Sequence, residues 1–306
     1  EIVNHKTYVL AGDGCLMEGI SHEAMSLAGH LNLKNLVMLF DNNSISIDGP
    51  TSLAVSDNYK KRFESYGWYF QEINGHSEKE INKAIKKSLN SKKPSLISCI
   101  TIIGYGSPNK SGKSSSHGAA LGLNEVELVR KKLNWKYKPF EIPKEILNQW
   151  REIGKKGIVE EKKWNKIFNK KSKKIKNELN RVISDKLPKN FEKIAYKQKK
   201  KFFDLKIDLA SRQSSAHVLE GITNSIPELI GGSADLSGSN NTNTKHSVII
   251  KPSNFKGNYI HYGVREHAMA GIMNGMALHK GIIPYGGTFL VFLDYCKPSL
   301  RLSALM

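Results

Sequence analysis

The 306-residue sequence has only three cysteines, Cys15, Cys99 and Cys296, and no CxxC pair. An odd number of separated thiols argues against a disulfide framework and fits a reducing compartment, so we expect a cytoplasmic protein. The sequence has no apolar run of membrane-spanning length and no signal-peptide pattern at its amino end. With 39% hydrophobic and 25% charged residues, it has the composition of a folded, soluble protein.

Acidic residues are scarce, with 28 Asp and Glu against 47 Lys and Arg, and the formal net charge is +19. Residues 151–206 alone hold 20 basic and 7 acidic side chains. Such an excess raises the question of nucleic-acid binding. However, Arg is rare in this stretch, and no regular aromatic residues interleave with the lysines to stack bases. We interpret it as a solvated helical face and expect neither a nucleic-acid nor a membrane partner.

Two polar motifs follow apolar strands near the amino end. Gly-Asp-Gly at residues 12–14 follows a predicted strand at 8–11, and Asp-Asn-Asn at 41–43 follows another at 35–40. Each motif alone is ordinary turn chemistry. Together they frame a βαβ unit whose carboxyl edge carries oxygen donors, and open α/β sheets bind ligands at that edge. The pair predicts a Mg²⁺ or Ca²⁺ ion bridged to a diphosphate.

The remaining chain alternates strands and helices, which predicts an α/β fold with mainly parallel sheets flanked by helices. In the first half we expect helices at 21–31, 58–66, 78–88 and 125–133, and strands at 68–73 and 95–103. Residues 144–183 read as largely helical, 187–188 as a break, and the Lys-rich run 197–201 as the boundary to a second unit. There we expect helices at 211–225, 266–279 and from 289, strands at 229–233, 259–261 and 282–285, and a polar loop at 237–245.

A long Gly-, Ser- and Lys-rich segment at 104–122 is predicted to be a loop, and it contains His117. Loops of this length inside compact domains are functional or disordered. A lone loop histidine is more often merely exposed to solvent. Because this loop follows a strand of the same sheet, His117 is also a candidate for the site at the carboxyl edge.

Five motifs stand in one order along the chain. They are Gly-Asp-Gly with Asn-Asn at 12–14 and 42–43, the loop histidine His117, Gly-Ser-Ala-Asp-Leu at 232–236, Tyr-Gly-Val-Arg-Glu-His-Ala-Met at 262–269, and Gly-Gly-Thr-Phe-Leu-Val-Phe-Leu-Asp-Tyr at 286–295. With them the sequence resembles the transketolases, a family of thiamine-diphosphate enzymes. The resemblance covers residues 8–305 and is weakest across the basic stretch.

The resemblance implies two thiamine-diphosphate-binding-type domains. Residues 1–195 correspond to the diphosphate-binding domain, with a basic helical linker at about 140–195, and residues 196–306 to the pyrimidine-binding domain. Segments that the family carries before and after these residues are absent from the sequence. We therefore expect an internal fragment whose second domain is truncated, and we expect it to be inactive on its own.

The resemblance also implies how the cofactor is held. Asp13, the Asn43 side chain and the Ile45 main-chain carbonyl resemble the ligands of a divalent cation, and oxygen donors suit Mg²⁺ or Ca²⁺ rather than zinc. Gly12 and Gly14 would bring the backbone close to the diphosphate.

Glu266 matches the family's glutamate at N1′ of the aminopyrimidine, where a carboxyl can hold a proton. Without the family match it could be a carboxylate favoured by a helix N-terminus. Phe289, Phe292 and Tyr295 recur at helical spacing, which ordinarily means core packing, but the matching family aromatics line the pyrimidine pocket. Asp235 matches an aspartate that approaches the cofactor from the partner subunit.

Three further residues are expected at the substrate. His117 resembles a family histidine near both the cofactor and the reacting carbonyl, where it could transfer a proton. Arg212 and Ser239 match positions that bind the sugar phosphate, and a guanidinium suits that oxyanion. Ser239 could equally be plain loop chemistry.

We therefore expect a homodimeric transferase of the pentose phosphate pathway. It would move a two-carbon ketol unit from a ketose phosphate such as xylulose 5-phosphate to an aldose phosphate such as ribose 5-phosphate or erythrose 4-phosphate, with thiamine diphosphate and Mg²⁺ or Ca²⁺ as cofactors. The alternatives are another thiamine-diphosphate enzyme of similar build (deoxyxylulose-phosphate synthase, dihydroxyacetone synthase or phosphoketolase), a basic nucleic-acid-binding protein, and a split half-subunit that binds cofactor only with a second polypeptide.

Overall fold

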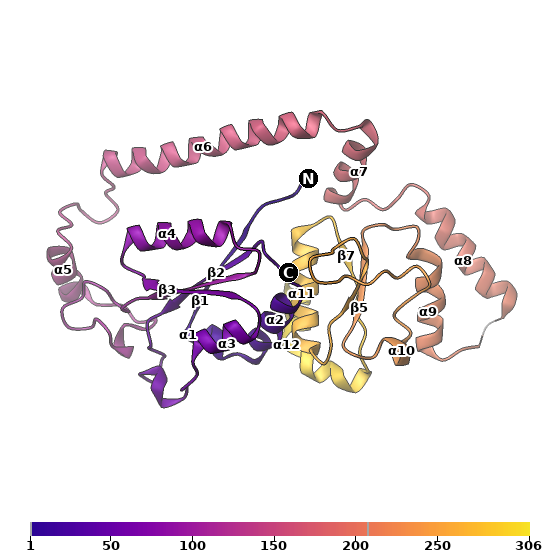
Figure 1. Cartoon of the computed structure of the whole chain (residues 1–306), viewed down its shortest axis with the longest axis horizontal. Coiled ribbons are helices and arrows are strands. Elements are labelled where there is room, and N and C mark those ends of the chain that lie inside the picture. The colour runs from indigo at the N-terminus through magenta and orange to yellow at the C-terminus, as the bar shows by residue number, and fades with distance from the viewer. Residues whose placement is uncertain (1, 207) are drawn as a thin grey trace. The chain divides into compact units, whose positions relative to one another are not determined.

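The computed structural model describes residues 2–206 and 208–306. The chain divides into two compact units: unit 1 comprises Glu1–Glu18 and Asn32–Lys171, and unit 2 comprises Gly19–Leu31 and Ser172–Met306. Figure 1 labels most of the elements of the two units. The predicted domain division at residue 195 stays a prediction.

Unit 1 is built on a four-stranded parallel sheet in the order β1-β2-β4-β3. The strands are β1 (Thr7–Gly12), β2 (Leu36–Asn42), β3 (Tyr69–Asn74) and β4 (Ser95–Ile100). All four end at the same edge, because parallel strands that are connected by crossovers run in one direction. The parallel α/β sheet predicted from the sequence is confirmed.

Helices cover both faces of this sheet. Helix α4 (Glu78–Leu89) packs its Ala84 against Val37 and Ile97 on one face. On the other face, α3 (Tyr59–Ser65) places Tyr59 edge-on against Phe40, with ring centroids 4.8 Å apart. Because helices cover both faces of the sheet, β4 is buried along its length except at its last residue, Ile100.

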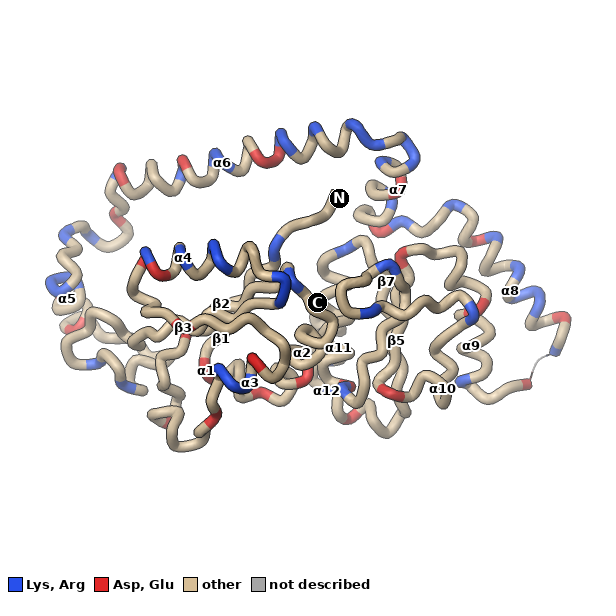
Figure 2. Tube along the Cα trace, viewed as in Figure 1, with Lys and Arg blue, Asp and Glu red and all other residues tan. Residues whose placement is uncertain are grey.

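The other helices of unit 1 have the following bounds. They are α1 (Asp13–Met17), α5 (Leu123–Lys132), α6 (Lys144–Asn169) and the 3₁₀ turns η1 (Thr51–Leu53) and η2 (Ser114–Ser116). Helix α6 carries the first part of the basic stretch, residues 151–169, and Figure 2 shows Lys and Arg spread along it. None of its residues is buried, in agreement with a solvated face.

Unit 2 is built on a three-stranded parallel sheet in the order β6-β5-β7. The strands are β5 (Leu229–Ser233), β6 (Tyr259–His261) and β7 (Ile283–Pro284). Its helices are α2 (Gly19–His30), α7 (Lys173–Ile183), α8 (Phe191–Leu205), α9 (Ser211–Ile222), α10 (Ser237–Asn240), α11 (Glu266–His279) and α12 (Leu293–Leu305), with the 3₁₀ turn η3 (Leu290–Phe292). Helix α11 packs against both α2 and α12.

The Lys-rich run 197–201 lies inside α8, and its assignment as a boundary stays a prediction. Two other sequence predictions for unit 2 are wrong in detail. The segment 237–245 is not wholly a loop, since its first turn forms α10. Phe289 precedes the helical segment, which begins as the 3₁₀ turn η3 and continues as α12, so the aromatic stripe is not borne by one α-helix.

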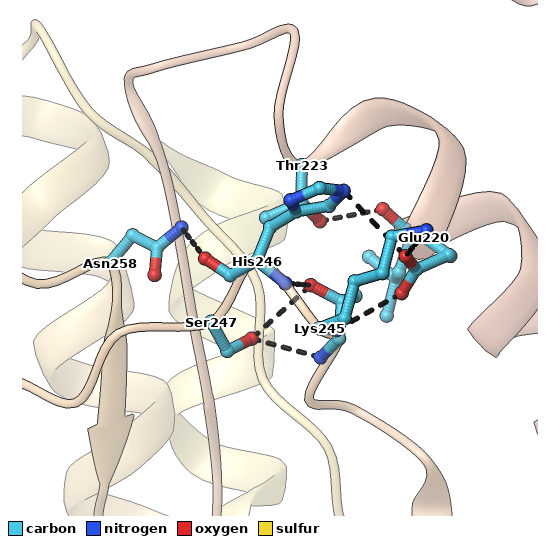
Figure 3. Close-up of polar contacts among 8 residues, drawn as sticks. Glu220, Thr223, Lys245, His246, Ser247 and Asn258 are labelled. Atoms are coloured by element: carbon cyan, nitrogen blue, oxygen red, sulfur yellow. Dashed lines mark hydrogen bonds and ion pairs between the residues drawn. The ribbon is translucent and has the colours of Figure 1, made fainter.

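The segment between α10 and β6 is attached to α9 by polar contacts (Figure 3). Glu220 on α9 accepts the backbone N–H of Lys245 at 3.1 Å and forms an ion pair with its Nζ at 3.0 Å. His246 Nε2 lies 3.6 Å from the same carboxylate, and the Asn258 amide donates to the His246 carbonyl. Burial raises the pKa of Glu220, but the hydrogen bonds and charge of Lys245 outweigh it, and the pKa is lowered.

Among the described residues, no helix is both long and apolar enough to cross a lipid bilayer.

Candidate functional site

The edge of the unit 1 sheet brings Asp13 and Asn43 together. Asp13 is the first residue of α1, directly after β1, and Asn43 directly follows β2. Because β1 and β2 pair with Gly12 opposite Asp41, the two polar residues meet at the same level of the sheet. The Asn43 N–H donates to Asp13 Oδ2 at 3.2 Å, and the Ile45 N–H donates to Asn43 Oδ1 at 3.0 Å.

The Asp13 carboxylate is buried and only partly hydrogen-bonded. Its residue is 4% exposed, and Oδ1 has no hydrogen-bond partner. Burial raises the pKa of Asp13, the backbone N–H groups of Asn43 and Ser44 oppose that shift, and the charge of Asp41 adds to it. A buried carboxylate oxygen without a partner costs free energy, and a cation would stabilise it.

The backbone around Asp13 leaves space for a ligand. A Cβ atom built at Gly12 or Gly14 would meet no atom within 4 Å apart from its chain neighbours and nearby helix backbone, and neither glycine has a positive φ. The chain's own packing and conformation therefore do not require glycine there. Ser44 has φ 61°, a left-handed conformation that is uncommon for a residue with a side chain. Such strain is often found at ligand-binding sites.

Sequence reasoning missed the support that α3 gives to this edge. Arg62 donates to the Leu16 carbonyl at 3.3 Å, near the end of α1, and pairs with Asp57 at 3.0 Å. Its guanidinium lies 4.9 Å from the centroid of the Tyr59 ring. Burial raises the pKa of Tyr59, and the charge of Asp13 raises it further. A basic residue on a helix gives no local signal of such a contact.

The structure does not bring His117 to Asp13 through any direct contact. His117 is exposed and follows η2, with its N–H bonded to the Ser114 carbonyl. The loop that carries it is held instead by Glu125 of α5, which sequence reasoning also missed. Glu125 is 7% exposed and accepts hydrogen bonds from the Ser107 hydroxyl and from the N–H and side-chain amide of Asn109, at 2.9 and 2.8 Å for the latter two.

Unit 2 contains a cavity of about 650 Å³ that gathers four of the predicted residues. We call it the Glu266 cavity. The predicted residues that line it are Asp235, Glu266, Phe292 and Tyr295. Glu266 is the first residue of α11 and is 7% exposed. The ring centroids of Phe292 and Tyr295 lie 5.9 Å apart. Carboxylates and aromatic rings on one cavity can bind a flat heterocycle and exchange protons with it.

Glu23 lines the same cavity and was not predicted. It lies on α2, and its Oε2 accepts the N–H of Ala268 at 2.9 Å. That N–H belongs to the first turn of α11, where backbone donors have no partner within the helix. Glu23 therefore both caps α11 and adds a third carboxylate beside Glu266. Its role depends on the packing of α2 against α11, which no local sequence pattern indicates.

A second cavity in unit 2, of about 710 Å³, is lined by Arg212 and Phe289. We call it the Arg212 cavity. Two of its lining residues hold buried polar atoms without a hydrogen-bond partner, Asn240 Nδ2 and Thr288 Oγ1. Unsatisfied donors beside a guanidinium suit an anionic, hydroxyl-rich ligand. Ser239 lies on the exposed surface of α10 and lines neither of the two cavities.

Two family models match the chain and together span almost all of it. "Transketolase, thiamine diphosphate binding domain" matches residues 1–188, and "Transketolase, pyrimidine binding domain" matches residues 208–306.

Curated relatives and solved structures agree with the family models. The transketolase of Buchnera aphidicola subsp. Acyrthosiphon pisum is 48% identical over 311 residues, covering 100% of this chain and 46% of the relative. Transketolase 2 of Escherichia coli K12 is also 48% identical with the same coverage. The transketolase of Pichia stipitis, solved in complex with sedoheptulose 7-phosphate, superposes with a TM-score of 0.90 at 38% identity, covering 99% of this chain and 46% of that one. The chain thus spans about half the length of the relatives it matches.

Proposed function

The chain belongs to the transketolase family, and we propose that it forms part of an enzyme that transfers a two-carbon ketol unit between sugar phosphates. The donor would be a ketose phosphate such as xylulose 5-phosphate, and the acceptor an aldose phosphate such as ribose 5-phosphate or erythrose 4-phosphate. The bound sedoheptulose 7-phosphate in the Pichia stipitis structure, itself a ketose phosphate, supports this substrate class.

The observation that carries the proposal is the buried, unpartnered Oδ1 of Asp13 beside Asn43. A carboxylate, an amide oxygen and the Ile45 carbonyl form an all-oxygen donor set, which fits Mg²⁺ or Ca²⁺. The open space at Gly12 and Gly14 supports close approach of a diphosphate to the backbone. We therefore assign the cation to Asp13, Asn43 and Ile45, and the diphosphate to the glycines beside Asp13.

When bound, thiamine diphosphate supplies the carbon that accepts and releases the two-carbon unit. The Glu266 cavity supports a role for this chain in holding the aminopyrimidine, with Phe292 and Tyr295 against the ring face. Glu266 would hold a proton at the ring nitrogen, and Asp235 would contact the same ring system. Phe289 lines the Arg212 cavity, and from that side its ring would add to the aromatic contacts of Phe292 and Tyr295 with the aminopyrimidine.

The Arg212 cavity supports binding of the substrate phosphate by the guanidinium, with the orphaned Asn240 and Thr288 groups as further donors. Ser239 and His117 are assigned to the substrate from the family resemblance alone. His117 would transfer a proton at the reacting carbonyl. Because His117 is exposed on a long loop, a substrate could reach it directly from solvent.

We further propose that two copies form a homodimer in which each cofactor is held by unit 1 of one subunit and unit 2 of the other. The assignment of Asp13 to unit 1 and Glu266 to unit 2 supports this division of labour. The transfer would serve the pentose phosphate pathway in the cytoplasm, where three separated thiols stay reduced.

Cofactor binding to an Asp13→Ala variant tests the proposal. We expect the unmodified chain to bind thiamine diphosphate in a Mg²⁺-dependent manner and the variant to lose that dependence, because the cation loses its buried carboxylate. Circular dichroism titration with and without EDTA measures both. Asp48→Ala, which removes an exposed carboxylate of the following loop, is the matched control. Metal-dependent binding retained by Asp13→Ala would show that the cation assignment is wrong.

A further inference from the structure

Both ends of the Asn43 side-chain amide are hydrogen-bonded in unit 1. Its Nδ2 donates to Asp41 Oδ2 at 3.4 Å, and its Oδ1 accepts the Ile45 N–H at 3.0 Å. An amide turned by 180° would set its oxygen against the Asp41 carboxylate, which only accepts, and its NH₂ against an N–H donor. The two partners therefore select one orientation. In that orientation Oδ1, the only atom of the group that can ligate a cation, keeps one free lone pair.

Asp41 is in turn held by Thr101, which follows β4. The Thr101 hydroxyl donates to Asp41 Oδ1, while its N–H donates to the Asn42 carbonyl at 3.1 Å. The pairing of β2 with β4, which sets Asp41 opposite Cys99, brings these two residues side by side. One Asp41 oxygen is thus occupied by Thr101 and the other faces the Asn43 amide.

Gly75, which follows β3, leaves space for the Thr101 side chain. A Cβ atom built at Gly75 would lie only 2.4 Å from Thr101 Cγ2, so only glycine leaves space for that methyl group. The Gly75 N–H also donates to the Ile100 carbonyl at 2.8 Å. Glycine at position 75 therefore permits the position of Thr101 in which its hydroxyl reaches Asp41. The chain of hydrogen bonds runs from Thr101 through Asp41 to Asn43.

We propose that Asp41 and Thr101 are positioning residues that orient the Asn43 amide, so that its oxygen is presented to the divalent cation. The inference rests on the cation site of the proposed function and adds the residues that set its geometry. Groups that hydrogen-bond to metal ligands orient them, and their loss typically lowers metal affinity by about 10–100-fold. Neither Asp41 nor Thr101 touches the cation in this arrangement.

Mn²⁺ binding to the full 306-residue chain, followed by electron paramagnetic resonance with thiamine diphosphate present, tests the proposal. Thr101→Val keeps the shape of the side chain and the charge of Asp41 but removes the hydroxyl. We expect its Mn²⁺ affinity to fall about tenfold. Thr101→Ser restores a hydroxyl and should bind like the unmodified chain. Thr7→Val, an equivalent change on β1 at the opposite edge of the sheet, is the matched control.

Two results would overturn the inference. One is a Thr101→Val variant that binds Mn²⁺ as the unmodified chain does. The other is an Asp41→Ala variant that binds Mn²⁺ as the unmodified chain does, because this change removes the acceptor that selects the orientation of the Asn43 amide.

A measurement without metal separates failure of this inference from failure of the proposed function. The Asn43 side-chain amide protons, assigned in NMR spectra by their loss in Asn43→Ser, should exchange with solvent faster in Thr101→Val than in the unmodified chain. If the unmodified chain binds no Mn²⁺ while this difference is present, the cation site is wrong and the orienting contact is right. Equal exchange rates would refute the orienting contact itself.

Discussion

At the scale of single residues, two of the buried carboxylates, Asp13 and Glu125, are in opposite situations. Asp13 is short of hydrogen bonds, with one oxygen unpartnered and a raised pKa. Glu125 is saturated with them, and the hydrogen bonds from Ser107 and Asn109 lower its pKa to about 2. The unpartnered oxygen of Asp13 is typical of a carboxylate that binds a ligand, whereas the hydrogen bonds of Glu125 are typical of a carboxylate that stabilises the fold.

Glu125 should therefore stabilise the fold in a pH-dependent way. Its pKa falls from 4.5 to about 2 on folding, so its contribution is present above pH 4.5 and is lost as the pH falls towards 2. We expect Glu125→Gln to lower the melting temperature at pH 7 and the difference from the unmodified chain to shrink between pH 4.5 and 3. Circular dichroism melts across this range measure it.

Glu127→Gln, an exposed change on the same helix, is the control for Glu125. A difference in melting temperature that stayed constant from pH 7 to pH 3 would contradict the assigned ionisation.

At the scale of elements, a buried ion pair fastens α7 to the sheet of unit 2. Arg181 donates to both oxygens of Glu228, at 2.7 and 2.8 Å, and the two side chains are 13% and 5% exposed. Glu228 directly precedes β5, and its carbonyl accepts the N–H of Ile283 in β7. Arg181 thus belongs to the basic stretch but, unlike its solvated lysines, has a structural role in a buried ion pair.

Removal of one partner from this pair leaves a buried, unpaired charge. We expect Arg181→Ala to lower the free energy of unfolding by about 3–5 kcal/mol, measured by urea denaturation. Asn177→Ala, an exposed change on the same helix, should have little effect. The double variant Arg181→Met with Glu228→Leu should recover most of the loss, since no charge is then buried alone. Equal losses in the single and double variants would refute the ion pair as the cause.

At the scale of the whole molecule, the proposed site draws on both units. Asp13 lies in unit 1, and the Glu266 cavity lies in unit 2. If each cofactor in the proposed dimer takes its cation from one subunit and its pyrimidine contacts from the other, two different defects can complement each other. A site shared between copies is one that mixing experiments can detect.

Neither Asp13→Ala nor Glu266→Ala alone should bind thiamine diphosphate in a metal-dependent manner. A statistical mixture of the two variants should recover about a quarter of the sites, because half of the dimers are mixed and each has one intact site. Isothermal titration after subunit exchange measures the recovery. A mixture of Asp13→Ala with the double variant should recover none. Absence of recovery in mixed dimers would mean that each subunit holds its own cofactor.

Local patterns were sufficient to predict most elements. The apolar runs and turn residues predicted the strands of both sheets, and the predicted helix at 266–279 agrees with α11. These signals are local because side-chain periodicity and capping act over a few residues. Where a short polar segment was predicted to be a loop but its first turn forms α10, the prediction was wrong because tertiary context overrides weak propensity.

By itself the sequence determined the α/β class, the family, and the residue types at the carboxyl edge of the sheet, because these follow from local motifs and from their order along the chain. Only the tertiary structure decided which groups meet. Strand pairing sets Asp41 against Thr101, and the packing of α2 on α11 brings Glu23 to Ala268. Such contacts join residues far apart in the chain. Their geometry depends on the packed sheet and helices, which no short stretch of sequence encodes.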